Sequence, residues 1–561
     1  MSSNTPHPEY LGAGGPSYRS DSDAPEGSRR RWPVLGATAA GVAAALGLGG
    51  WGAYALLSGG GLQPADALPA SAVAYVSLDL DPSAGQKIEA FKILKKFPGI
   101  DEELDISSTD DLRRMIFDKV QDEGSCTGLD YDADINPWIG ERVALAAVPD
   151  DQAGIDAPVL ALQVSDEEAA AEGIRALARC ADAGDYGYAF HAGYVLITDT
   201  DARAEALVAD AAQGSLADSA AFQEWTGKVG DPGIVTMYAG PDAPDFLADV
   251  ESGMSDDWFG YATGDPEAAL ELRDEQSEAS EKLRDAYKDF AGMAGVVRFD
   301  DGAVEAEFAM QGLPTGLNAV TGLTGPNVTE LPASTGAAFS VALAEGWLTG
   351  YLESMAEVFS SGESVDEMLA DAERDTGLEL PEDIETLFGD GVSVAFDSDV
   401  DFEAIFDEGD FTKLPVGLRV SGNPDEILPV VDKVRAAIGP DGDVVVAEPG
   451  DGVVAFGANP DYTKLLSGDG TLGSDETFQR AVPEADKASA VLYVNFDAGG
   501  WIEEAADAVE AMESGFAGEE AAEDDAAATS LRENVAPLDA LGLSAWMDGD
   551  VQRGVFRLTT D

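Results

Sequence analysis

The chain has 561 residues, of which 107 are Asp or Glu and 32 are Lys or Arg, so its formal net charge is −75. A nucleic-acid-binding protein needs a basic face to neutralise phosphates, and this excess of acids excludes that class of function. Hydrophobic residues form 45% of the chain, which is enough to bury a core, and a length of about 150 residues per domain suggests two to four domains.

The N-terminal segment, residues 1–31, is rich in Gly, Pro and Ser and lacks apolar periodicity. Such a segment buries too little apolar surface to offset its loss of conformational entropy. We therefore predict a disordered tail, which ends in Arg29, Arg30 and Arg31.

Residues 34–57 form a run without a single charged side chain. As a helix rising 1.5 Å per residue, this run is long enough to cross a hydrocarbon core of about 30 Å. The arginines before it and the acidic chain after it place the N-terminal tail in the cytoplasm by the positive-inside rule. We expect a single-pass cell-membrane protein whose large acidic region is extracellular, so that one partner is the membrane itself.

A cleaved signal peptide is the alternative interpretation of this run. The small residues Ala65, Asp66 and Ala67 resemble a cleavage site, and the arginine cluster resembles a twin-arginine signal. The apolar region of a signal peptide is usually about 7 to 15 residues long, which favours an uncleaved anchor here. Because no cysteine follows the run, a lipoprotein anchor at this point is excluded.

The chain contains two cysteines, Cys126 and Cys180. In an extracytoplasmic region a disulfide between them is expected to be stable. The alternative is a pair of free buried thiols, since spacing alone does not bring two Cα atoms within bonding distance.

Internal repetition is the strongest organisational signal. A Leu-Pro-Ala-Ser segment begins at Leu68 and again at Leu331, and a strand-like run follows each. An Asp-Ile pair at residues 134–135 and 383–384 precedes a glycine and a further strand-like run. The later correspondences keep the same order: strands at 143–148 and 392–396, strands at 159–164 and 416–420, helices around Ile174 and Val431, turns at Gly193 and Gly452, strands at 234–238 and 489–493, and Asp-Gly turns at 301–302 and 548–549.

These correspondences predict two tandem copies, residues 68–312 and 331–561, joined by a linker at 313–330. Each copy has about eight strands, many of them adjacent in hairpins, interrupted by helices. The expected fold class is α+β, with a largely antiparallel sheet and packed helices in each copy after one N-terminal transmembrane helix. The copies differ in one insert, a charged amphipathic helix at 266–290 whose counterpart contains the acidic tract 517–528.

The segment from Asp134 through Pro137 and Trp138 to Gly140 precedes a Val-Ala-Leu-Ala strand. Together with the N-terminal span and the Leu-Pro-Ala-Ser openings, it resembles the bacterial domain-of-unknown-function family 3352. The resemblance covers nearly everything after Leu57, although the second copy carries Thr386 and Leu387 where the first has Pro137 and Trp138. It implies a membrane-anchored envelope protein of high-GC Gram-positive bacteria or cyanobacteria, and it supplies no catalytic residues.

The search for catalytic motifs gives mainly negative results. The histidines are His7 in the tail and His191 beside a turn, so a nucleophile system would rest on His191 alone. HExxH, CxxC, GxSxG and Walker sequences are missing from the chain. A GxGxxG pattern at residues 47–52 lies inside the apolar run, where helix packing explains it. We therefore predict no catalytic residues and no cofactor.

Five residues match the spacing of a calcium-binding loop at its positions 1, 3, 5, 7 and 12: Asp130, Asp132, Asp134, Asn136 and Glu141. Position 6 is Ile135, where the sharp turn of such a loop requires glycine. The alternative is a structural turn in which Asp134 caps the backbone before Pro137, Trp138 and Gly140. This interpretation is favoured because Asp383 recurs at the equivalent place without the other acids, so we predict no metal site.

Three functional classes remain. The anchor, the duplication and the missing catalytic motifs favour a non-catalytic binding or scaffold module of the cell envelope, whose partner is a protein, a polymer or a lipid. One alternative is a carrier of an apolar ligand in a groove between sheet and helices, which a continuous apolar cavity would support. The other is a carboxylate-based hydrolase, which a pocket with two carboxylates of raised pKa would support.

Overall fold

The computed structural model describes residues 62–80, 84–97, 113–114, 117–118, 121, 128–149, 158–180, 186–246, 284–312, 327–359, 365–400, 402, 405, 409–439, 444–504, 506 and 535–561. The predicted tail at 1–31, the predicted span at 34–57 and the acidic tract 517–528 lie outside these residues, as does the insert helix up to residue 283. None of the described helices is both long and apolar enough to span a membrane.

The described residues form one antiparallel sheet of sixteen strands, which confirms the predicted α+β class. The first half of the chain supplies eight of them: β1 (Ala74–Asp79), β2 (Ile139–Ala147), β3 (Val159–Val164), β4 (Gly187–His191), β5 (Tyr194–Thr198), β6 (Val235–Ala239), β7 (Gly292–Asp300) and β8 (Ala303–Gln311). Their spatial order is β8-β7-β6-β1-β2-β3-β5-β4.

The second half supplies the other eight strands: β9 (Thr335–Ala342), β10 (Gly391–Asp397), β11 (Val416–Ser421), β12 (Val446–Pro449), β13 (Val453–Gly457), β14 (Ala490–Asn495), β15 (Leu538–Asp548) and β16 (Val551–Thr560). Their order is β16-β15-β14-β9-β10-β11-β13-β12. Each strand of the second half therefore occupies the place of the strand eight positions earlier in the first half.

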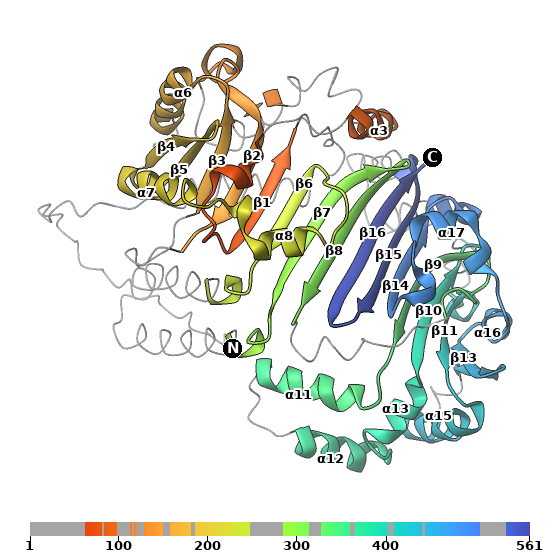
Figure 1. The fold of residues 1–561 in the computed structure, drawn as a ribbon. Helices are drawn as coiled ribbons and strands as arrows, with labels where there is room; N and C mark the ends of the chain where they lie inside the picture. The colour runs from red at the N-terminus through yellow and green to blue at the C-terminus, as the bar shows by residue number, and fades with distance from the viewer. Residues whose placement is uncertain are drawn as a thin grey trace, which may run out of the picture.

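The two halves meet where β8 pairs with β16. The pairing runs from Gln552 opposite Met310 to Thr559 opposite Ala303, so that backbone hydrogen bonds continue from one half into the other. In Figure 1 the green strands β7 and β8 pass directly into the blue strands β16 and β15. This continuous sheet was not predicted from the sequence.

One face of the sheet carries the two largest cores. In the first half, α2 (Pro64–Ala67), α7 (Asp201–Ala211) and α8 (Ala220–Thr226) cover inward side chains such as Tyr75, Leu196 and Tyr238. In the second half, α16 (Pro460–Leu466) and α17 (Glu476–Ala481) cover Ala395 and Tyr493. Figure 1 shows α8 and α17 in front of the sheet, with the central strands between them.

The opposite face of the sheet also carries helices. Neighbouring side chains along β5 point to opposite faces, since Tyr194 lies in the first core and Val195 contacts the residues packed under α6 (Glu167–Cys180). The remaining helices are α3 (Ala84–Leu94), which packs over β7, and α11 (Trp347–Phe359), α12 (Val365–Thr376), α13 (Glu382–Phe388) and α15 (Pro424–Ile438) in the second half.

Local sequence signals explain where several helices begin. Thr200 caps α7 by accepting a hydrogen bond from the Arg203 backbone, and Asp475 caps α17 in the same way. α15 begins with Asn423, which accepts from Asp425, followed by Pro424 in the first turn. Short polar side chains at these positions satisfy backbone N–H groups that have no partner within the helix.

The hairpin turns predicted at residues 301–302 and around Gly193 and Gly452 are confirmed. The turn predicted at residues 548–549 lies one residue later, because Asp548 pairs with Val551 and the central residues are therefore Gly549 and Asp550. Asp301 and Gly302 connect β7 with β8 at φ values of 46° and 76°, which are the positive angles required at both central residues of a tight hairpin. Gly193, Gly452 and Gly549 also have positive φ in their turns.

Residues just before the predicted domain starts also pack into the cores. Ala65 and Ala67 are buried with Leu68, and Val328 is buried with Leu331. The Leu68 carbonyl accepts a hydrogen bond from Leu216, and the Leu331 carbonyl accepts one from Leu472. The core of each half thus includes residues before the Leu-Pro-Ala-Ser segment.

Candidate functional site

The turn predicted around Asp134 begins with one turn of π-helix at Tyr131–Ile135. The Asp134 carboxylate accepts a hydrogen bond of 2.8 Å from the Asp130 backbone N–H. Its carbonyl oxygen accepts another of 2.7 Å from the indole Nε1 of Trp138, which is almost completely buried. Asp134 therefore holds both the start of the turn and the tryptophan that follows it.

Asp383 makes the corresponding contact in the second half. Its carboxylate accepts a hydrogen bond of 2.7 Å from the backbone N–H of Glu379, again four residues earlier. It also pairs with Lys433 of α15 at 2.8 Å. Burial alone would raise the pKa of Asp383, but the hydrogen bonds from Lys433 and from the Glu379 backbone outweigh it and lower that pKa.

The other acids of the calcium-like spacing make contacts within the protein. Asp130 accepts a hydrogen bond from the Ala133 backbone, and Asp132 pairs with Arg114 at 2.6 Å. That hydrogen bond lowers the pKa of Asp132. The Glu141 backbone N–H donates to the side chain of Gln163. These contacts fit a structural turn.

The indole of Trp138 fills the space between the turn and α6. It lies against Gly173 so closely that a Cβ atom added there would be 2.1 Å from the indole Nε1. Ala170 and Ile174 of the same helix complete this core. The absence of a side chain at Gly173 is therefore what allows α6 to approach the tryptophan.

The corresponding place in the second half, between α13, α15 and the sheet, holds a cavity of about 190 Å³. Apart from Arg435, its lining is apolar: Leu387, Phe388, Leu418, Val420, Val431, Val434, Ile438, Val445 and Phe456. Leu387 stands where Trp138 stands in the first half. We call this space the α15 cavity.

Among the described residues, Arg435 is the one charged side chain that lines the α15 cavity. Its Nη2 donates a hydrogen bond of 2.6 Å to the Val445 carbonyl, and its Nη1 lies 3.7 Å from Asp432. Its Nε is buried and has no hydrogen-bond partner within the part of the chain that the structure describes.

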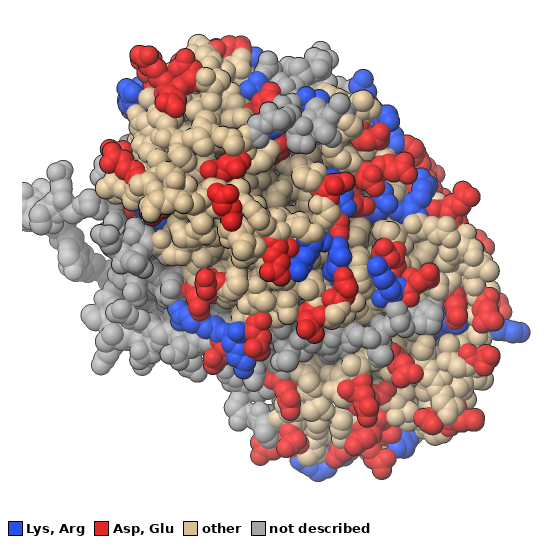
Figure 2. Space-filling view, in the orientation of Figure 1, with Lys and Arg blue, Asp and Glu red and all other residues tan. Residues whose placement is uncertain are grey.

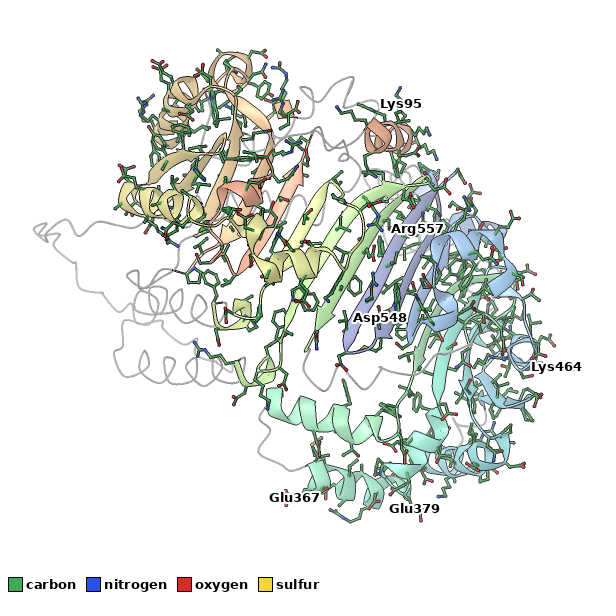
Figure 3. The ribbon with its side chains drawn as sticks, viewed as in Figure 1. Lys95, Glu367, Glu379, Lys464, Asp548 and Arg557 are labelled. Carbon is green, nitrogen blue, oxygen red and sulfur yellow. The ribbon has the colours of Figure 1, made fainter. Side chains whose placement is uncertain are left out.

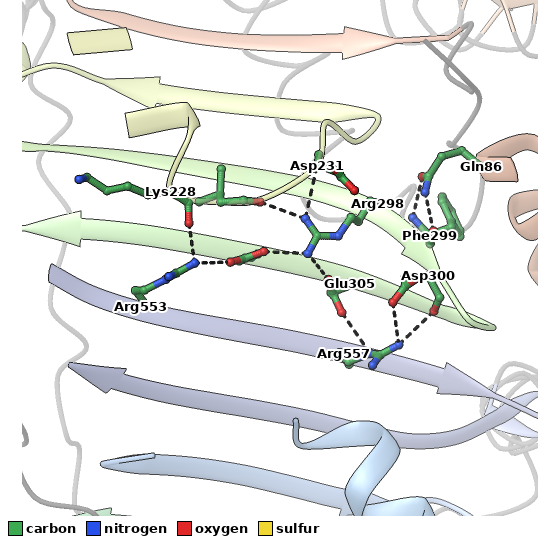
Figure 4. Close-up of polar contacts among 11 residues, drawn as sticks. Gln86, Lys228, Asp231, Arg298, Phe299, Asp300, Glu305, Arg553 and Arg557 are labelled. Carbon is green, nitrogen blue, oxygen red and sulfur yellow. Dashed lines mark hydrogen bonds and ion pairs between the residues drawn. The ribbon is translucent and has the colours of Figure 1, made fainter. Parts of the chain in front are cut away.

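A second cluster of charges lies on the central strands. Arg298 of β7 contacts Glu305 and Glu307 of β8 at 2.5 and 2.7 Å, and Glu307 also contacts Arg553 of β16 at 2.8 Å. Arg557 of β16 lies 3.4 Å from Glu305. Figure 4 shows that this network, which we call the seam network, crosses from β7 over β8 to β16.

The seam network is only partly accessible to water. The side chains of Glu305 and Glu307 are 8% and 11% exposed, so their charges depend on the arginines. Burial alone would lower the pKa of Arg298, but the hydrogen bond that it donates to Glu307 and the charges of both glutamates outweigh it and raise that pKa. Arg553 and Arg298 also donate to the Lys228 and Val229 carbonyls beyond α8.

Three acids come together at the C-terminal end of the sheet. Carboxylate oxygens of Asp497, Asp539 and Asp561 all lie within 4.8 Å of one another. Burial, followed by the negative charge of Asp561, raises the pKa of Asp497 to about 6. Asp539 is already bound to Arg480 and to Thr559, so this cluster is part of a hydrogen-bond network.

The remaining candidate residues are the two histidines and the two cysteines. His191 ends β4 opposite Tyr194 and is partly buried. His7 and Cys126 lie outside the described residues, as does the side chain of Cys180 at the end of α6, so the candidate disulfide stays a prediction.

Sequence reasoning did not identify the seam network or Arg435. The available signal was a pair of glutamates two residues apart in β8 and a pair of arginines four residues apart in β16, because even spacing places each pair on one face of its strand. The α15 cavity had a weaker signal, which was the replacement of Trp138 by Leu387.

Comparison with the curated proteins and with the solved structures found no match. A match to a protein family covers about a quarter of the chain and includes the Asp134 turn, but it ends at residue 185, whereas the predicted resemblance extended over nearly everything after Leu57. Residues 38–185 match the family model described as Protein of unknown function (DUF3352), which confirms the predicted family resemblance over that segment.

Proposed function

We propose that the chain is a single-pass membrane protein whose large acidic region is a non-catalytic binding or scaffold module of the cell envelope. The observation that carries this proposal is the pairing of β8 with β16, reinforced by the seam network. Two halves joined by a continuous sheet and by partly buried ion pairs form one stiff platform. A stiff surface held at a membrane suits the binding of a protein, polymer or lipid partner.

The proposal includes two tandem copies of one α+β unit. The strand order supports this. Starting from the central strand of each half, β8 or β16, and moving toward the outer edge of the sheet, equivalent strands follow in the same order. Asp134 and Asp383 accept hydrogen bonds from backbone N–H groups four residues earlier, and Leu68 and Leu331 accept equivalent backbone bonds. Repeated contacts at repeated positions are expected when one unit has been duplicated.

The proposed membrane anchor is the uncharged run at 34–57, with the tail in the cytoplasm and the sheet outside. The chain directly after the run packs into the first core, where Ala65 and Ala67 are buried and the Leu62 carbonyl accepts a hydrogen bond from Tyr194. Cleavage near Ala67 would remove these contacts. Retention of the anchor is therefore the interpretation that the packing supports.

Protease treatment of intact cells tests the topology. We expect an added protease to digest the region beyond residue 61 while an epitope within residues 1–31 stays protected. Protection of the C-terminal region would reverse the orientation, and a mature N-terminus near residue 66 would establish secretion in place of anchoring.

Chemical cross-linking in intact membranes, followed by purification of the tagged full-length chain, tests the binding role. We expect one envelope component to be enriched over a control that carries only residues 1–61 and the tag. Its absence, or turnover of an ester, glycoside or peptide substrate by the purified chain, would contradict the proposal.

A further inference from the structure

The α15 cavity exists because the two halves fill the same place differently. In the first half, the indole of Trp138 occupies the space beneath α6 and lies on Gly173. In the second half, Leu387 replaces the indole, and α15 carries Val431 and Val434 on its inner side. The smaller side chain leaves about 190 Å³ unfilled between the helix and the sheet.

An unfilled apolar space is unfavourable for the protein by itself. The side chains around it lose dispersion contacts, and a cavity without polar groups does not hold water well. A ligand that supplies apolar atoms would restore these contacts, as apolar molecules do in engineered apolar cavities. The lining therefore selects for an apolar group in the ligand.

The mouth of the α15 cavity is apolar as well. Ile438 and Val445 line the cavity and are nevertheless 58% and 41% exposed, and the neighbouring Val444 is 51% exposed. These three exposed apolar side chains lie at the end of α15 and just before β12. An extended apolar chain entering between them would cover all three.

Arg435 gives the site a preference for a ligand with a negatively charged group. It is a cation in a chain of net charge −75, and it lies at the cavity with its Nε buried and without a hydrogen-bond partner in the described part of the chain. A carboxylate at the mouth would bind the outer Nη1, because Nε is buried, Nη2 already donates to Val445, and guanidinium groups bind carboxylates through charge-assisted hydrogen bonds. The neighbouring Asp432 holds only the outer Nη1, at 3.7 Å.

We propose that the α15 cavity binds a free straight-chain monocarboxylic acid, with its alkyl chain beneath α15 and its carboxylate on Arg435. A carbon group of an alkyl chain takes up about as much space as a water molecule, roughly 30 Å³, so the cavity holds about six carbon groups. This indicates a fatty acid of about eight carbons, of which those next to the carboxylate lie at the apolar mouth and the methyl end lies deepest. This ligand site is additional to the partner surface proposed above.

Photolabelling of the full-length chain in detergent tests the site. The probe is a medium-chain fatty acid that carries a diazirine near its methyl end, and the labelled peptides are identified by mass spectrometry. We expect saturable labelling within α13, α15, β11 and β13, and competition by octanoate. Octanol should compete at least tenfold less well, because it lacks the carboxylate.

Two variants fill the cavity from opposite sides. Leu387→Trp restores the side chain of the first half, and Val434→Phe fills the space from α15. Each should reduce saturable labelling at least tenfold without lowering the urea midpoint by more than does Leu465→Ser, a control at an exposed position of α16 outside the cavity. If one variant fails to fold, the other still decides the question.

The charge of Arg435 is tested separately. Arg435→Gln should weaken competition by octanoate about tenfold and leave competition by octanol unchanged. Labelling that does not saturate in the wild-type chain, or that both filling variants leave intact, would overturn the proposal. Equal competition by octanoate and octanol would overturn the role of Arg435. Neither result bears on the pull-down of an envelope partner, so the two proposals fail independently.

Discussion

At the scale of single residues, two carboxylates have opposite pKa shifts, because hydrogen bonds outweigh the effect of burial at Asp383, whereas burial and the negative charge of Asp561 act in the same direction at Asp497. Asp383 is held by Lys433 of α15, which lowers its pKa below the ordinary value. Asp497 lies beside Asp561 and Asp539, and its pKa is raised to about 6. A lowered pKa stabilises the folded state at neutral pH, whereas a raised pKa destabilises it there.

Asp383→Asn should lower the free energy of unfolding by about 1–2 kcal/mol at pH 7, because the hydrogen bond to Lys433 loses its charge. The folded pKa lies below the unfolded value of about 3.9, so the contribution of Asp383 is present above that pH and is lost as the pH falls through the folded pKa. Urea titrations at pH 7 and pH 3 measure the difference. Asp432→Asn is the exposed control, and equal effects of the two variants would contradict this role.

Asp497→Asn should have the opposite effect on stability. Between about pH 4 and pH 6 the folded protein binds a proton that the unfolded chain releases, so the wild type loses stability as the pH rises. The variant should therefore have a higher urea midpoint than the wild type at pH 7.5 and nearly the same midpoint at pH 4. A variant that is less stable at pH 7.5 would show that the three carboxylates attract a cation or a further donor.

At the scale of secondary-structure elements, the central strands depend on the seam network. Glu307 contacts Arg298 on one side and Arg553 on the other, so it links the two halves through side chains as well as through the β8–β16 pairing. In Figure 3, Arg557 and Asp548 lie on these central strands, between the helix-covered parts of the two halves. The negative charge of Glu307 should therefore stabilise both halves.

Glu307→Ala should destabilise the protein by on the order of 3 kcal/mol, since it leaves two partly buried arginines without their shared carboxylate. Glu224→Ala is the matched control, because its ion pair with Lys228 is on the surface and 67% of its side chain is exposed. The control should change stability by about 0.5 kcal/mol or less. Equal losses in the two variants, measured by urea unfolding, would show that the seam network contributes no more than a surface pair.

The sequence predicted those elements that depend on local patterns. The strand at Val159–Val164 follows from a short run of apolar residues, and the turn at Asp301 and Gly302 follows from the positive φ that glycine accepts. The pairing of β8 with β16 was not predicted, because it joins residues about 250 positions apart and no turn fixes its register. The α15 cavity depends on the volumes of Leu387 and Val434, which periodicity does not report.

At the scale of the whole molecule, the acidic balance is the dominant property. Residues 1–60 contain equal numbers of acids and bases, so the net charge of −75 lies in the rest of the chain. Figure 2 shows Asp and Glu side chains scattered across the visible face, with some Lys and Arg side chains near its centre and others toward its edges. Mutual repulsion of these carboxylates opposes folding and weakens as salt shortens the Debye length.

A fragment of residues 62–561 should therefore have a higher urea midpoint in 1 M sodium chloride, where the Debye length is about 3 Å, than in 0.01 M, where it is about 30 Å. Millimolar calcium should act in the same direction through many weak contacts. Asp132→Asn combined with Glu141→Gln should keep most of that response, because Asp132 pairs with Arg114. A midpoint independent of salt would contradict the repulsion, and loss of the calcium response in the double variant would support a specific calcium loop.

The central claim is that both halves form one sheet through β8 and β16, and an engineered disulfide tests it most directly. Ala306 of β8 lies opposite Phe556 of β16, so cysteines at these positions have the Cα separation that a disulfide requires. With Cys126 and Cys180 replaced by serine, Ala306→Cys with Phe556→Cys should cross-link on mild oxidation, as shown by mass spectrometry of the joined peptides. Ala306→Cys with Leu558→Cys, two residues out of register, should cross-link far less. Equal cross-linking of both pairs, or none in the folded protein, would contradict the continuous sheet.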